Sequence, residues 1–173
     1  MIYIINGYPQ SGKDSVVSIF EELHPGIMVG NYSSVELPKE IFSIFKEYDK
    51  SPEGRAKLSQ VKSVLEGRVD YVRVEVEDRL RLVDVLFVHC REVRNIKRLQ
   101  RQFPGSVTVF VKRSKAKEEY LSGRVTNGSD SDVEGMSYDV VINNEGSLED
   151  LKREVKAKLT GEAFLKPSGY FDW

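Results

Sequence analysis

Apolar and polar residues are arranged along this chain in blocks that predict strands and helices in turn. Short apolar runs rich in β-branched and aromatic residues predict five strands, at residues 2–5, 27–32, 85–88, 107–111 and 138–142. Between them, apolar residues recur at steps of three and four, which indicates helices. Strands that alternate with helices predict an α/β fold with a five-stranded, mostly parallel sheet flanked by helices.

The helical segments differ in how clearly the sequence marks them. Pro52 suits the first turn of a helix, and Ser147 with Asp150 has the spacing of a capping box at the start of the last helix. Residues 69–83 carry both helical and alternating patterns, and their length favours a helix.

The loop after the first predicted strand has a glycine pattern with a chemical meaning. Residues 7–15 read Gly-Tyr-Pro-Gln-Ser-Gly-Lys-Asp-Ser, a G-x-x-x-x-G-K motif with a strand before it and a helix after it. Glycines allow consecutive backbone amides to wrap a phosphate chain, and Lys13 adds a cation for the β- and γ-phosphates. The sequence therefore predicts a nucleotide phosphate site with a catalytic Lys13. Its expected nucleotide-binding residues are Gly7, Gln10, Ser11, Gly12, Lys13, Asp14 and Ser15.

The residue after Lys13 departs from the usual form of this motif. A serine or threonine hydroxyl normally binds Mg²⁺ there, but this chain has Asp14 followed by Ser15. A carboxylate can hold the metal directly or through water. Asp14 and Ser15 are therefore the predicted magnesium ligands.

Polar residues follow the predicted strands at the sheet edge where α/β proteins bind ligands. Arg91 follows the strand at 85–88, and its planar fork suits a phosphate group of the substrate. The neighbouring His89 and Cys90 lack further metal ligands nearby in sequence, so we interpret both as structural.

Two further segments are long enough to carry function. Residues 113–135 form a long polar connection that begins with Arg113, which we interpret as a lid over the site. Residues 31–83 are predicted to be mostly helical. We interpret them as the region that binds a second substrate, the acceptor of a phosphate group, with Ser33 and Arg55 as candidate ligands.

Composition narrows the remaining choices. The 173 residues carry a net charge of −1 and are 40% hydrophobic, which suits a single globular domain over 1–173. The near-neutral charge gives no reason to expect nucleic-acid binding, and no apolar run is long enough to span a membrane. A single cysteine and the absence of a signal peptide indicate a cytoplasmic protein.

Three segments together resemble a group of small P-loop kinases that have G-K-D in place of G-K-S/T. The group includes bacteriophage-type deoxynucleoside monophosphate kinases, with animal phosphomevalonate kinase as a relative. Residues 11–14 resemble its R-S-G-K-D loop, and residues 88–91 lie where its third strand ends in D-T-R. Residues 142–151 read Ile-Asn-Asn-Glu-Gly-Ser-Leu-Glu-Asp-Leu, close to I-x-N-D/H-G-S-L-E-E-L. His89 replaces the aspartate of D-T-R, which leaves Asp14 with more of the metal binding.

The resemblance implies transfer of the γ-phosphoryl group of ATP, with Mg²⁺, to a nucleoside monophosphate, a deoxynucleoside monophosphate above all. It implies that Arg91 holds the acceptor phosphate, that Arg113 closes over the reaction, and that Asn143 and Gly146 lie near the adenine. Two alternatives stay open: a kinase for a non-nucleotide phosphate, and a nucleotide-binding regulatory module without catalysis. We expect the aromatic tail, with Phe164 and Trp173, to pack on the body or on a second subunit, and the latter would give a homodimer.

Overall fold

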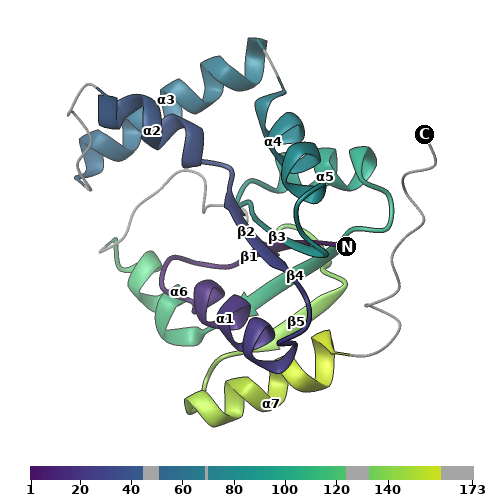
Figure 1. Ribbon diagram of the computed structural model, residues 1–173. Coiled ribbons are helices and arrows are strands. Elements are labelled where there is room, and N and C mark those ends of the chain that lie inside the picture. Colours follow the sequence, from purple (N-terminus) through teal and green to yellow (C-terminus); the bar gives the residue numbers. More distant parts are fainter. Residues whose placement is uncertain (45–50, 69, 124–132, 161–173) are drawn as a thin grey trace.

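Five strands form the centre of the computed structural model, which describes residues 1–44, 51–68, 70–123 and 133–160 (Figure 1). The strand order is β2-β3-β1-β4-β5, and every neighbouring pair is parallel. The five-stranded sheet is thus confirmed, and it is all-parallel rather than mostly parallel. The strands are β1 Ile2–Asn6, β2 Val29–Ser33, β3 Val85–His89, β4 Val107–Lys112 and β5 Val140–Asn143.

Seven helices connect or follow these strands in the described residues. They are α1 Lys13–Leu23, α2 Glu36–Ile44, α3 Pro52–Arg68, α4 Tyr71–Leu80, α5 Val93–Gln102, α6 Ser114–Leu121 and α7 Leu148–Leu159. The helical interpretation of the ambiguous segment is confirmed by α4, and Pro52 opens α3 as expected. The predicted capping box of Ser147 and Asp150 is also present at the start of α7.

The central strand β1 explains why the chain needs helices on both faces of the sheet. Its side chains alternate between two cores: Tyr3 and Ile5 pack with α1 and α7, and Ile2 and Ile4 pack with α4 and α5 (Figure 1). All five residues of β1 are buried, as expected for a strand at the middle of a covered parallel sheet.

The last strand begins two residues later than predicted. Oδ2 of Asp139 accepts hydrogen bonds from the backbone N of Thr108 (2.8 Å) and from its hydroxyl (2.6 Å). The side chain of Asp139 therefore occupies a position beside β4 that a longer β5 would fill with backbone. Periodicity alone does not reveal such a competing contact.

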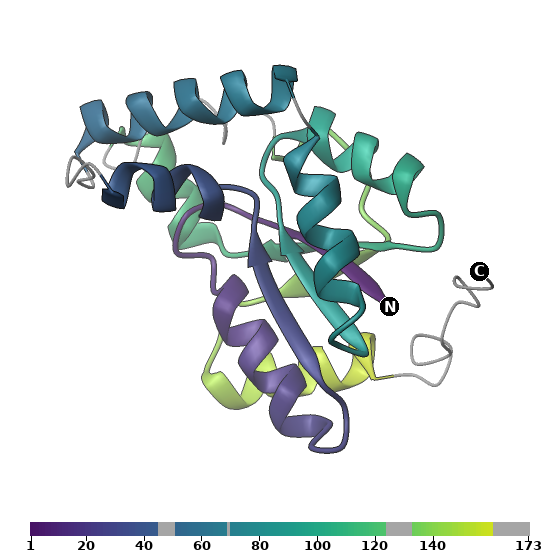
Figure 2. The same cartoon turned by 45° about the horizontal axis from the view of Figure 1, so that its top comes forward.

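The region between β2 and β3 extends beyond the carboxyl end of the sheet. Helix α2 follows β2 and packs against α3, and α3 in turn contacts α4 (Figure 2). Residues of α2, of α3 and of the loop after β1 line one cavity at this edge of the sheet. Within the described residues, no helix has the length and apolar character needed to cross a membrane.

Candidate active site

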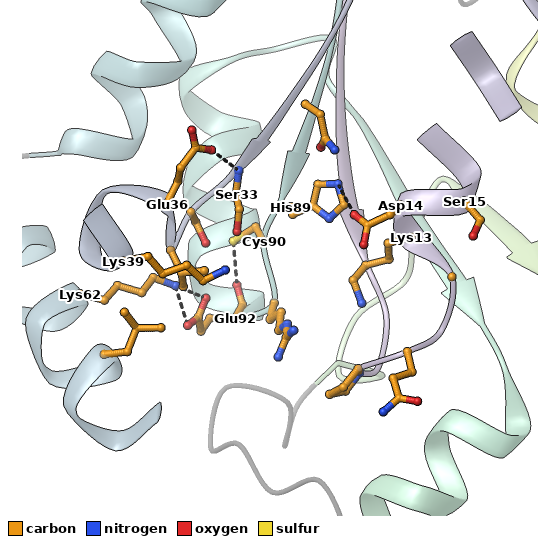
Figure 3. A pocket seen from close by; sticks show the side chains of 18 of the residues that line it. Lys13, Asp14, Ser15, Ser33, Glu36, Lys39, Lys62, His89, Cys90 and Glu92 are labelled. Atoms are coloured by element: carbon orange, nitrogen blue, oxygen red, sulfur yellow. Dashed lines mark hydrogen bonds and ion pairs between the residues drawn. The ribbon is translucent and has the colours of Figure 1, made fainter. Parts of the chain in front are cut away.

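A cavity of about 660 Å³ lies at the carboxyl ends of β1 and β3, where ligands bind in open α/β sheets. One wall is the loop after β1 with the start of α1, including Lys13, Asp14 and Ser15. We call this wall the donor half. The opposite wall, which we call the acceptor half, comes from the β2–α2 connection, α2, α3 and the β3–α5 connection (Figure 3).

The loop of the donor half has a backbone that only particular residues can adopt. Gly7 and Gly12 have φ angles of 148° and 97°. A Cβ on Gly7 would lie 2.6 Å from the carbonyl oxygen of Val111, and one on Gly12 would overlap the side-chain amide of Asn144. Gln10 also has a positive φ, of 63°. The two glycines thus set the close turns of a phosphate-binding loop.

The side chain of Lys13 folds back onto this loop. Its ammonium group donates to the carbonyl oxygens of Gly7 (2.7 Å) and Tyr8 (2.8 Å), and it lies 3.5 Å from Oγ of Ser11. These contacts place the cation across the opening of the loop, where phosphate oxygens would exchange for the carbonyl groups. The expected role of the motif lysine, binding of the β- and γ-phosphates, stays a prediction.

The predicted metal ligands begin α1. Asp14 and Ser15 both line the cavity, and the side chain of Asp14 is 91% exposed. Among the described residues, no group of three His, Cys, Asp or Glu side chains could hold a metal ion. A divalent ion at Asp14 would therefore take most of its ligands from nucleotide phosphates and water, as Mg²⁺ commonly does in such sites.

His89 ends β3 between the two halves of the cavity. Nε2 of His89 lies 3.9 Å from Oδ1 of Asp14, and the side chain of His89 is 13% exposed (Figure 3). Burial, together with the nearby Lys13 and Arg91, lowers the pKa of His89 to about 4, although Asp14 opposes the shift. The imidazole is therefore neutral near pH 7.

A buried asparagine connects the loop to the position of the predicted acceptor arginine. Oδ1 of Asn6 accepts a hydrogen bond from the backbone N of Gly7 (2.7 Å), and its Nδ2 donates to the carbonyl oxygen of Arg91 (3.2 Å). Nδ2 also donates to the hydroxyl of Tyr138 (2.6 Å), which donates to the carbonyl oxygen of Val133. Sequence analysis missed Asn6 and Tyr138. The sequence signal that could have identified Asn6 is its place as a polar residue directly after the apolar run of residues 2–5.

A buried ion pair supports the acceptor half. The ammonium group of Lys62 from α3 lies 2.6 Å from both carboxylate oxygens of Glu92 at the start of α5. The side chains of Lys62 and Glu92 are 6% and 27% exposed. Both line the cavity, together with Ser33 and Lys39 (Figure 3). The acceptor half is thus fixed by a contact between two segments that are distant in sequence.

The structure brings most predicted site residues to this cavity. Gln10, Gly12, Lys13, Asp14, Ser15, Ser33, Arg91 and Arg113 line it, while Gly7 and Ser11 form the loop behind it. Nη1 of Arg113 donates to the carbonyl oxygen of Gln10 at 3.1 Å, so the start of the predicted lid contacts the loop. Arg55 belongs to α3, but its side chain lies outside the described residues, as do residues 124–132 of the lid.

Two predicted nucleotide-binding residues, Asn143 and Gly146, are not among the residues that line this cavity. The side chain of Asn143 donates to Glu154 of α7, and Gly146 lies against Asp150, where a Cβ would be 2.5 Å from the carboxylate. Their neighbour Asn144 instead contacts the loop, with Nδ2 donating to the carbonyl oxygen of Ser11 at 2.8 Å. Their predicted place near the adenine stays a prediction.

Comparison with known proteins defines the fold. No family model and no curated protein matches the sequence. The structure is similar to that of the APS kinase of Mycobacterium tuberculosis in complex with AMPPNP and APS, with 18% identity and a TM-score of 0.52 over 90% of this chain and 95% of that one. It is also similar to the shikimate kinase of Aquifex aeolicus, with 16% identity and a TM-score of 0.52 over 95% of this chain and 99% of that one.

The chain has a P-loop kinase fold. Its five parallel strands, the loop of residues 7–13 and the cavity at the carboxyl edge of the sheet have the arrangement that this fold requires.

Proposed function

We propose that this protein transfers the γ-phosphoryl group of ATP to a small acceptor that carries a phosphate. The observation that carries the proposal is the shared cavity, in which a phosphate-binding loop with Lys13 faces a second wall that contains Lys39 and Arg91. Two anionic reactants need two cationic regions that hold them next to each other. The similarity to an APS kinase in complex with AMPPNP supports this interpretation.

The residues of the chain would act by positioning and by charge neutralisation. Backbone amides of the loop and Lys13 would hold the donor phosphates, and Arg91 would hold the acceptor phosphate. Arg113 would add positive charge from the side of the predicted lid. Asp14 and Ser15 would hold the Mg²⁺ that accompanies ATP, which neutralises charge on the phosphates when it is bound.

A deoxynucleoside monophosphate is our first candidate for the acceptor, because of the resemblance to the G-K-D kinases. A non-nucleotide phosphate is the second candidate, and one observation favours it. None of the described residues that line the cavity is Phe, Tyr or Trp, whereas stacking on such a ring is a common way to bind a base. The acceptor half offers hydroxyl groups, apolar side chains such as Leu58, and charged groups.

The test is acceptor-dependent turnover. Purified protein with ATP and a divalent ion would be incubated with nucleoside and deoxynucleoside monophosphates in one panel and with phosphorylated sugars and alcohols in another. Formation of ADP that requires one acceptor, together with a doubly phosphorylated product, is the expected result. Tight ATP binding with no acceptor-dependent ADP from either panel would instead support the regulatory module. The cytoplasmic location and the homodimer remain predictions beside this proposal.

A further inference from the structure

The space between α1 and the end of β3 has an unsatisfied polar atom on its buried side. Nε2 of His89 is buried and has no hydrogen-bond partner among the described residues. Oδ1 of Asp14, the nearest acidic oxygen, is 3.9 Å away, which is too far for a hydrogen bond (Figure 3). Several buried side-chain atoms of the described residues lack a partner, but Nε2 of His89 is the one whose residue lines the cavity, where a bound group can supply that partner.

His89 lies in the middle of the site because of its position in the sheet. It pairs with Ile5 of β1 on one side and with Ser33 of β2 on the other. The imidazole therefore lies beside the loop of the donor half and at the edge of the acceptor half. Any ion held by Asp14 next to the donor phosphates would come close to Nε2.

We propose that Nε2 of His89 is a further ligand of the divalent ion at Asp14, and that the site consequently favours Mn²⁺ or a similar transition-metal ion over Mg²⁺. The inference rests on the proposed function, because the ion accompanies a nucleotide. Two atoms that are each about 2.1 Å from one ion are separated by at most about 4.2 Å, so the observed gap permits a shared ion. Imidazole nitrogen suits transition metals, whereas Mg²⁺ strongly prefers oxygen.

The surrounding charges determine when the ion can bind. Lys13, Lys39 and Arg91 are the cations whose charges act on His89, and Asp14 is the only acidic group among those that act on it. A divalent ion alone would be repelled by these cations and would have at most three protein side chains as ligands, those of Asp14, Ser15 and His89. Phosphate oxygens of a nucleotide would supply both negative charge and further ligands. We therefore expect metal and nucleotide to bind together.

Pulsed electron paramagnetic resonance of Mn²⁺ tests the inference directly. The wild-type protein with Mn²⁺ and ADP should show coupling of the metal to a histidine ¹⁴N nucleus. The chain has only two histidines, and the other, His24, follows the opposite end of α1, where its Nδ1 contacts the carbonyl oxygen of Phe20. His24→Asn should thus retain the nitrogen coupling, and His89→Asn should lose it.

Affinity provides the second measurement. Dissociation constants of ADP would be compared by calorimetry in Mn²⁺ and in Mg²⁺ for the wild type, His89→Asp and His24→Asn. Loss of a group that supports a metal site weakens metal binding by about 10- to 100-fold, so His89→Asp should reduce the preference for Mn²⁺ by at least about 10-fold, and His24→Asn should not change it.

The two proposals fail in different ways. If the wild type binds ADP with Mn²⁺ but shows no ¹⁴N coupling, His89 is not a ligand and the inference is overturned while the kinase proposal stands. An unchanged metal preference in a folded His89→Asp variant would overturn it as well. If the wild type binds no adenine nucleotide with either metal, the proposed function fails and the inference fails with it.

Discussion

The donor and acceptor halves of the cavity are built in opposite ways. The contacts of Lys13 in the donor half join residues five or six positions apart. In the acceptor half, Lys62 and Glu92 are 30 positions apart, and Tyr71, which donates to the carbonyl oxygen of Ser34, is 37 positions away from it. The cation of the donor half is thus held by local contacts, although Arg113 and Asn144 also reach this loop from distant segments. The ion pair of the acceptor half exists only when distant segments have assembled.

This difference has a physical consequence for function. A local loop can keep its shape when parts of the domain change, because its backbone angles are set by its own glycines. An acceptor half assembled from α2, α3 and the β3–α5 connection depends on the packing and charges between those elements. Its specificity can therefore change through residues that never touch the acceptor.

The largest effect is expected from the donor half. Lys13→Ala should lower kcat by about 10²- to 10³-fold, the usual loss when one group that stabilises developing charge is removed. Its ammonium group donates to carbonyls and a hydroxyl of the loop, and Lys13 belongs to none of the hydrophobic cores of the described residues, so the fold should persist. Steady-state kinetics with the acceptor found in the panel would measure the loss.

The matched control for this variant is Lys156→Ala, which removes an exposed lysine of α7 that does not line the cavity. It should leave kcat unchanged within about 2-fold. Near-normal turnover of Lys13→Ala would show that the loop does not hold the donor, and thermal melting of both variants would detect a general loss of stability.

The next effect belongs to the acceptor half and is a loss of stability. Lys62→Met keeps the length of the side chain but leaves the carboxylate of Glu92 without the ammonium group that contacts both of its oxygens. We expect a loss of up to about 3 kcal/mol, at the lower end for a broken buried pair, because Glu92 keeps partial exposure. Denaturant unfolding would measure the change in the free energy of unfolding.

A double variant sharpens this result. Lys62→Met combined with Glu92→Gln removes both charges and should recover part of the loss, because the carboxylate that had faced the Lys62 ammonium group is also removed. If the double variant is as unstable as the sum of the two single variants, the pair is not energetically coupled. The stability of the acceptor half would then come from packing alone.

The same contrast explains what the sequence could predict. The alternation of apolar blocks indicated all five strands. The glycine spacing indicated the loop in which Gly7 and Gly12 adopt positive φ angles and Lys13 contacts the backbone, because the loop is formed by consecutive residues. The pair of Lys62 and Glu92 was not predictable, since nothing in the sequence says that these two positions meet. His89 was interpreted as structural for the same reason: only the assembled sheet places it opposite Asp14.

Arg91 belongs to the acceptor half, and its variant tests whether the two halves bind different reactants. Arg91→Ala should raise the KM of the acceptor by about 10- to 100-fold, the equivalent of the 1.5–3 kcal/mol that a charged hydrogen bond contributes. The KM of ATP should change much less, because the donor phosphates are held by the loop. Initial-rate kinetics with each substrate varied in turn would measure both values, and equal increases would contradict the assigned role.

The smallest effect concerns the scaffold behind the donor half. The hydroxyl of Ser147 accepts a hydrogen bond from the backbone N of Asp150, and Asp150 accepts from the hydroxyl and the backbone N of Ser147. Ser147→Ala should therefore lower the free energy of unfolding by about 1 kcal/mol, as for other helix caps. Because α7 packs on α1, well away from the acceptor half, the acceptor KM should stay constant.

The pH dependence of this loss distinguishes the cap from a packing defect. Hydrogen bonds from Ser147 lower the pKa of the Asp150 carboxyl below its ordinary value of 3.8. A lowered pKa in the folded state stabilises the protein above the ordinary pKa, and this stabilisation is lost as the pH falls through the lowered value. The difference between Ser147→Ala and the wild type should thus be largest near about pH 7 and should shrink towards about pH 2. Urea unfolding across this range would measure it, and a difference that stays constant with pH would show that the carboxylate of Asp150 has no part in the cap.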